Sequence, residues 1–193
     1  PYTMNYKVVL LLFLFSIQLS AQEYAYDVSE TYPYGRPHPD APQQLLEYEL
    51  LIGECECTST RRNPDQTWGA PEAMIWRYKY NMNGAAVKDE NLKADGSHSG
   101  SIRQFIADSS QWYVHYYSNK APTTRLSTWK GGKRGDSIVL YNKQKAPNGA
   151  DGFYRITFSH ITKEGFHWLG EWTDTTETIT FPTWKIRCRK VKS

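Results

Sequence analysis

The sequence lacks the common motifs of catalysis and phosphate binding. It contains no Gly-x-Ser-x-Gly, no His-Glu-x-x-His, no glycine-rich phosphate loop and no pair of close acids in a recognisable spacing. The net charge is only +3, and the basic residues are scattered among acidic ones, so the charge pattern of a nucleic-acid-binding protein is also absent. The basic segment 185–190 alternates with other residues and indicates a strand with a charged outer face. We therefore expect no nucleic-acid partner, no cofactor and no metal.

Long apolar runs are also scarce. The one at residues 8–15 is too short to span a membrane, follows Lys7 and precedes the small residue Ala21. This pattern predicts a secretory signal peptide within residues 1–21, with residues 1–3 as read-through before Met4 and cleavage after Ala21. We expect a secreted or periplasmic protein whose mature chain has no integral membrane segment.

The remaining chain is long enough for one domain. Roughly 170 residues can enclose a sizeable core but are few for two domains. Residues 22–39 are rich in tyrosine and proline and predict an extended arm, either packed on the domain or acting as a spacer, with a peptide or glycan contact as the alternative. We assign the domain itself to residues 40–193.

Helical periodicity is nearly absent, whereas two-residue alternation and turn signals recur from Gly53 onward. Together with a strand that begins at Gly53, the predicted strands span residues 73–82, 85–92, 101–108, 111–118, 125–130, 136–143, 153–161, 166–173, the short 176–181, and 184–191. About ten short strands joined by tight turns favour an all-β, up-and-down antiparallel barrel over a sandwich, because closure removes exposed edges. One short helix is predicted over residues 43–52 at the barrel end, capped by Asp40 and with Pro42 in its first turn.

Cysteine is rare, and the positions of the three cysteines test this barrel. With an even number of strands, the first and last strands are antiparallel neighbours, so Cys188 near the end should lie beside Cys55 and Cys57 near the start. Alternation places all three thiols on the inner face. In an oxidising compartment we expect a disulfide between Cys188 and either Cys55 or Cys57. The spacing of the cysteines is weak evidence for a metal site.

Several segments resemble a known family. The Gly53-Glu54-Cys55 opening, the segment 152–173 and the closing segment 184–191 are similar to a family of secreted bacterial lipocalin-like (calycin) barrels, a domain of unknown function. The resemblance covers residue 43 to the end, and Cys55 stands where such barrels carry a tryptophan. It implies a barrel with an internal cavity that binds a small molecule, and it implies that Arg187 or Arg189 packs over the barrel floor.

Aromatic residues, in contrast, are abundant, with seven Trp and fourteen Tyr. Some strands carry rings on both faces, so some of these rings must line the barrel interior. They either fill a narrow barrel or surround a cavity for a largely apolar or aromatic molecule. We predict a non-catalytic ligand-binding protein. The candidate ligand-binding residues are Arg103, His115, Tyr117, Trp129 and Arg155.

Two other function classes stay open. Histidines on three predicted strands could support an enzyme inside the barrel, through His115 or through His167 with Glu171 on the same strand face. Alternatively, the tyrosine-rich arm could make the protein a module that binds another protein or a glycan.

Overall fold

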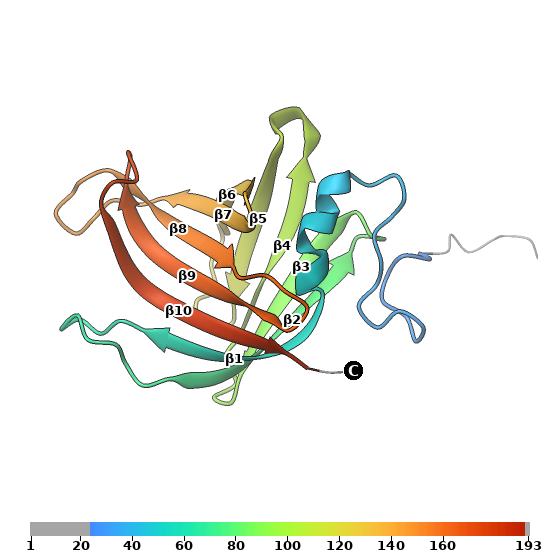
Figure 1. Ribbon diagram of the computed structural model, residues 1–193, viewed down its shortest axis with the longest axis horizontal. Helices are drawn as coiled ribbons and strands as arrows, with labels where there is room; N and C mark the ends of the chain where they lie inside the picture. Colours follow the sequence, from blue (N-terminus) through green and yellow to red (C-terminus); the bar gives the residue numbers. More distant parts are fainter. Residues whose placement is uncertain (1–23, 192–193) are drawn as a thin grey trace, which may run out of the picture.

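The chain folds into one closed antiparallel barrel of ten strands. The computed structural model describes residues 24–191 (Figure 1). Around the barrel each strand neighbours the next in the chain, and β1 pairs with β10 to close it. The all-β, up-and-down architecture predicted from the alternation is confirmed. The strands are β1 (Gly53–Arg61), β2 (Glu72–Asn81), β3 (Ala86–Lys93), β4 (His98–Ile106), β5 (Gln111–Ser118), β6 (Ser127–Arg134), β7 (Ser137–Lys143), β8 (Gly152–Ser159), β9 (Gly165–Asp174) and β10 (Thr180–Lys190).

Alternation along each strand separates an inner from an outer face. In β2, Met74, Trp76, Tyr78 and Tyr80 are buried inside, while the side chains between them are partly exposed on the outer face. The same period of two operates in β5 and β8. The inner faces together form the core.

A short helix closes one end of the barrel. This helix, η1 (Gln43–Leu51), is a 3₁₀ helix that buries Leu45, Tyr48 and Leu51 and leaves Leu46 and Leu50 exposed. The buried positions are three apart, which matches the three residues per turn of a 3₁₀ helix. Pro42 occupies the N-cap position and no side chain caps the helix, so the prediction that Asp40 caps it is wrong.

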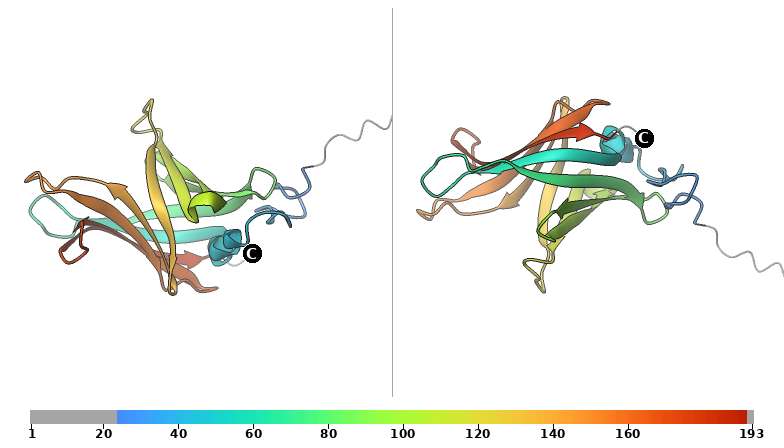
Figure 2. Two further views of the ribbon diagram at one scale, coloured as in Figure 1. Left: turned by 90° about the horizontal axis from the view of Figure 1, so that it is seen from above. Right: turned by 90° about the horizontal axis from the view of Figure 1, so that it is seen from below.

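The helix defines the two ends of the barrel. β1 begins directly after η1, and the last residues of β10 lie opposite the start of β1, so the C-terminus is at the same end (Figure 2). We call this the helix end, which also carries the turn between β8 and β9. Since successive strands are antiparallel, the loops 62–71, 94–97, 119–126, 144–151 and 175–179 lie at the opposite end, which we call the open end. A second short 3₁₀ helix, η2 (Ala107–Ser109), connects β4 and β5 at the helix end.

One predicted strand is not separate. The segment 176–181 splits into a turn and the start of β10, which then runs on to Lys190. The pairing of β10 with β9 shifts between Pro182 and Trp184. A bulge accommodates a proline that has no N–H for the ladder, so the strand continues through it.

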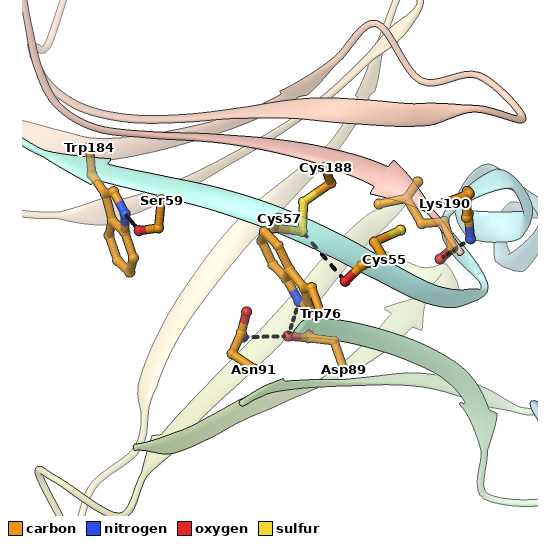
Figure 3. The surroundings of a disulfide bond; sticks show 10 residues. Cys55, Cys57, Ser59, Trp76, Asp89, Asn91, Trp184, Cys188 and Lys190 are labelled. Atoms are coloured by element: carbon orange, nitrogen blue, oxygen red, sulfur yellow. Dashed lines mark hydrogen bonds between the residues drawn. A yellow bond between two sulfur atoms is a disulfide. The ribbon is translucent and has the colours of Figure 1, made fainter. Parts of the chain in front are cut away.

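The disulfide lies where the first and last strands meet. Cys57 and Cys188 are directly opposite each other in β1 and β10 and form a disulfide, while Cys55 is a free, buried thiol (Figure 3). The predicted neighbourhood of the three cysteines is confirmed, and Cys57 is the partner of Cys188. The bridge joins residues 131 apart, which corresponds to about 4 to 5 kcal/mol in the chain-entropy model. A disulfide of this kind indicates an oxidising, extracytoplasmic environment.

The tyrosine-rich arm packs on the turn between β2 and β3. Arg36 lies over the rings of Tyr26 and Tyr32, at 4.7 and 4.5 Å from the ring centroids. The backbone N–H of His38 donates to the carbonyl of Gly84 at 3.1 Å. A Cβ at Gly84 would lie 2.5 Å from the carbonyl oxygen of Arg36, so glycine permits this close approach. The described residues of the arm therefore lie against the turn between β2 and β3. The predicted signal peptide lies outside residues 24–191.

Candidate functional site

The barrel interior contains a cavity of about 290 Å³ that extends to the open end. Its walls come from most of the strands and differ in chemistry. The side of β3, β4 and the end of β5 is polar, and the side of β8, β9 and β10 is apolar. The main lining residues are Arg61, Met74, Trp76, Asp89, Asn91, Lys93, Ser97, Ser99, Ser101, Arg103, Val114, Tyr116, Ser118, Lys120, Trp129, Tyr154, Ile156, Trp168, Trp184 and Ile186.

Two tryptophans dominate the apolar wall. Trp168 and Trp184 meet edge to face, with ring centroids 5.0 Å apart. The indole N–H of Trp184 donates to Ser59 Oγ at 2.8 Å, which fixes the ring (Figure 3). Tyr154 is similarly fixed by a 3.0 Å hydrogen bond between its hydroxyl and Thr183 Oγ1. This wall presents oriented aromatic surface to the cavity.

A buried ion pair forms the polar part of the cavity floor. Arg103 Nη2 donates to Asp89 Oδ1 at 2.6 Å, and both side chains are almost fully buried. The same carboxylate accepts from Trp76 Nε1 at 3.0 Å and from Ser101 Oγ (Figure 3 shows the Trp76 bond). Burial alone would lower the pKa of Arg103, but Asp89, Tyr78 and Tyr48 together outweigh burial and the pKa is raised. The carboxylate of Asp89 thus supplies the counter-charge that a buried guanidinium requires.

Below this pair the barrel is filled with rings. Tyr48 of η1, Tyr78 and Phe158 surround the guanidinium of Arg103, whose carbon lies 5.3 to 5.4 Å from their ring centroids. Burial raises the pKa of Tyr48 to about 12, so its hydroxyl stays neutral. Trp112 packs against Tyr48 at 4.7 Å and donates to Glu47 at 2.9 Å. The helix end is thus closed by packed aromatic side chains.

Basic side chains surround the open end of the cavity. Arg61 lies over the ring of Trp184, 3.8 Å from its centroid, and is exposed. Lys93 pairs with Glu72, and Lys120 is exposed beside Ser118. The entrance therefore combines positive charge with an aromatic wall.

The predicted ligand-binding residues divide between the two faces of the wall. Arg103 and Trp129 line the cavity. His115 and Tyr117 alternate with the buried Trp112 and Val114 and lie on the outer face. There His115 Nδ1 lies 3.0 Å from Thr128 Oγ1, and Tyr117 covers Gly100, where a Cβ would come within 2.8 Å of its hydroxyl.

Arg155 also lies on the outer face, because Ile156 and Phe158 beside it point inward. It pairs with Glu171 at 2.8 Å and with Glu177 at 2.7 Å. Glu177 comes from the loop between β9 and β10, so this network ties that loop to the outer wall. His115, Tyr117 and Arg155 were predicted to line the cavity, but all three lie on the outer face of the barrel.

The histidines of the alternative enzyme hypothesis are not in the barrel interior. His167 stacks on His160 with ring centroids 4.6 Å apart, and burial lowers the pKa of His167. Glu171, four residues along the same outer face, is engaged by Arg155 instead. The structure does not bring His167 and Glu171 together as a pair inside the barrel.

The two arginines that the resemblance implied for the barrel floor lie elsewhere. Arg187 and Arg189 are exposed on the outer face, where Arg189 pairs with Glu56, so neither packs over the floor; Arg103 does.

Within residues 24–191, no three His, Cys, Asp or Glu side chains are grouped as a metal site would require. In the same part of the chain, no helix has the length and apolar character to cross a membrane.

Sequence reasoning missed the tryptophans of the apolar wall and Asp89. Trp184 shares a face with Cys188, which the sequence already placed inward, so that signal was available. No comparable signal in the sequence pointed to Asp89, because an acidic residue in a strand normally faces water.

Comparison of the chain with protein-family models gives no match, and comparison with curated proteins gives none either.

Proposed function

We propose that this protein is a secreted or periplasmic, lipocalin-like barrel that binds a small, largely apolar or aromatic molecule non-covalently in its interior, without catalysis. The single observation that carries the proposal is the cavity of about 290 Å³, one side of which is an aromatic, apolar wall. Ligand pockets are typically apolar cavities of roughly 300 to 1,000 Å³ with a few oriented polar side chains. The volume is at the lower end of that range and favours a small ligand.

The energetic basis is burial of apolar surface. Each buried methylene group contributes about 0.8 kcal/mol. Trp168 and Trp184 are fixed by packing and by the hydrogen bond to Ser59, so binding would require little ordering of these side chains. A rigid apolar wall supports binding of a flat or flexible apolar group.

The proposal is tested with the neutral fluorescent probe N-phenylnaphthylamine. Ser99 lines the cavity, so Ser99→Phe should fill part of it and weaken probe binding by at least about tenfold. Thr157→Phe places the same ring on the outer face of β8 and serves as the matched control. Fluorescence titration of the three proteins gives the comparison. Equal probe binding by the wild type and Ser99→Phe would refute binding in the cavity.

A further inference from the structure

We propose that the ligand is an amphiphilic acid whose anionic group binds at the open end, against Arg61 and Lys120, while its apolar part occupies the cavity. This inference rests on the proposed function and names the chemical class of the ligand. It follows from how charge is distributed along the cavity wall.

The cavity lining is strongly unbalanced in charge. It contains four cationic side chains and a single acid, Asp89. Asp89 neutralises Arg103 on the floor, and Glu72 neutralises Lys93 at the open end. Arg61 and Lys120 remain, and neither forms an ion pair with an acid within residues 24–191. An anionic group supplied by a ligand would complete the charge balance of the lining.

Both cations are positioned to meet such a group. Arg61 is held over Trp184, itself fixed by Ser59, so its guanidinium lies at the edge of the apolar wall. Lys120 is on the facing side, where its backbone N–H donates to Ser118 Oγ at 3.2 Å. Asp95 in the nearby turn feels the charge of Lys120, but its oxygens accept hydrogen bonds from the backbone and hydroxyl of Ser97.

The floor is unsuited to the anionic group. Arg103 Nη2 is already bonded to Asp89, and the Nε and Nη1 atoms are buried without partners among the rings of Tyr48, Tyr78 and Phe158. An acid that entered this deeply would approach the Asp89 carboxylate, and two like charges in a buried site repel strongly. The apolar part therefore enters first and the acid stays at the open end.

The experiment compares two ligands that differ only in the charged group. Decanoate and decanol are titrated as competitors against N-phenylnaphthylamine, at low ionic strength and neutral pH. Decanoate should displace the probe at a concentration about three- to tenfold lower than decanol, which is the gain expected from one or two exposed ion pairs. In 1 M NaCl the Debye length is about 3 Å and this advantage should shrink.

Charge variants locate the effect. Lys120→Gln together with Arg61→Gln should remove the advantage of decanoate and leave decanol unchanged, since glutamine keeps most of the aliphatic stem. Lys163→Gln removes a charge from the exposed turn between β8 and β9 at the helix end, and should leave both ligands unchanged.

The outcomes separate the inference from the proposed function. If the wild type does not bind the neutral probe, both fail. If the probe binds in the cavity but decanol competes as well as decanoate, or the double variant weakens both ligands equally, the inference is overturned and the proposed function stands.

Discussion

The two halves of the barrel interior differ in how completely side chains fill them. At the helix end, Tyr48, Trp112 and Phe158 pack ring against ring and are shielded from solvent. At the open end, Trp168 and Trp184 border a cavity of about 290 Å³. The buried pair of Asp89 and Arg103 lies at the boundary. The comparison shows that packed rings fill one half, whereas the other half keeps the cavity to which the proposed function assigns binding.

The sharpest way to test this division is to remove one ring from each half. Phe158→Ala should lower the free energy of unfolding by about 3 to 5 kcal/mol, because it leaves a void among four other rings. Trp184→Ala should cost less, about 1 to 2 kcal/mol, and weaken probe binding, because its ring already borders open space. Urea denaturation and probe titration measure both. Equal stability losses would contradict the division.

The boundary is tested through its ion pair. Asp89→Ala should cost about 3 to 5 kcal/mol, because a buried guanidinium loses its counter-charge. A double variant, Asp89→Leu with Arg103→Met, should recover part of that loss since no charge is left unpaired. Denaturation curves of both variants decide this. If the double variant is less stable than Asp89→Ala, the cost does not arise from the unpaired charge.

The junction of β1 and β10 holds both halves closed. Replacing Cys57 and Cys188 together by alanine should cost about 2 to 5 kcal/mol, whereas Cys55→Ala should cost only about 1 kcal/mol because it removes one small buried group. Thermal unfolding under non-reducing conditions compares them. A Cys55→Ala loss as large as that of the double variant would show that packing, rather than the cross-link, stabilises the junction.

An ion pair outside the barrel should matter much less than the one inside. Glu177→Gln breaks the contacts with Arg155 and Arg134 and should cost at most about 1 kcal/mol, because these groups are partly solvated. Hydrogen bonds and nearby cations keep the pKa of Glu177 low despite partial burial, so its contribution is present at neutral pH and is lost as the pH falls through the folded pKa. Denaturation at neutral and acidic pH checks both statements. A Glu177→Gln cost equal to that of Asp89→Ala would contradict the comparison of inside and outside.

The smallest effect is expected in the loop between β9 and β10. The hydroxyl of Thr176 and the backbone N–H of Ile179 donate to Asp174, which lowers its pKa from 3.8 to about 2. A depressed folded pKa means that this contribution is complete above the unfolded value and is lost between pH 3.8 and about 2. Thr176→Val should raise the pKa, as an NMR titration of the carboxylate would show. An unchanged midpoint would remove Thr176 as the main cause.

The sequence predicted the barrel well because strand alternation and strand number are local signals. From these alone, the meeting of Cys188 with the first strand could be predicted. Which face of a strand points inward is harder where both faces carry rings, as in β5, and there His115 and Tyr117 were assigned to the wrong side. In β8 the apolar Ile156 and Phe158 could have placed Arg155 outside.

Arg103 was expected at the cavity, but its almost complete burial and its partner show the limit of such reasoning. Ile102 and Ile106 lie on one face of β4, and Arg103 lies on the opposite face. The two isoleucines suggest that their face is the buried one, yet Arg103 points inward. Its burial depends on Asp89 from the neighbouring strand, and a partner of this kind is visible only when the register between strands is known.

The most direct test of the central claim is a ¹H–¹⁵N NMR titration of the indole N–H signals with N-phenylnaphthylamine. The account predicts that the signals of Trp129, Trp168 and Trp184 shift with a single saturable curve, because these side chains line the cavity. Trp68, which lies under Arg62 and Lys185 on the outer face of the barrel, should not move. Shifts confined to Trp68, or unchanged signals for Trp129, Trp168 and Trp184, would contradict binding inside the barrel.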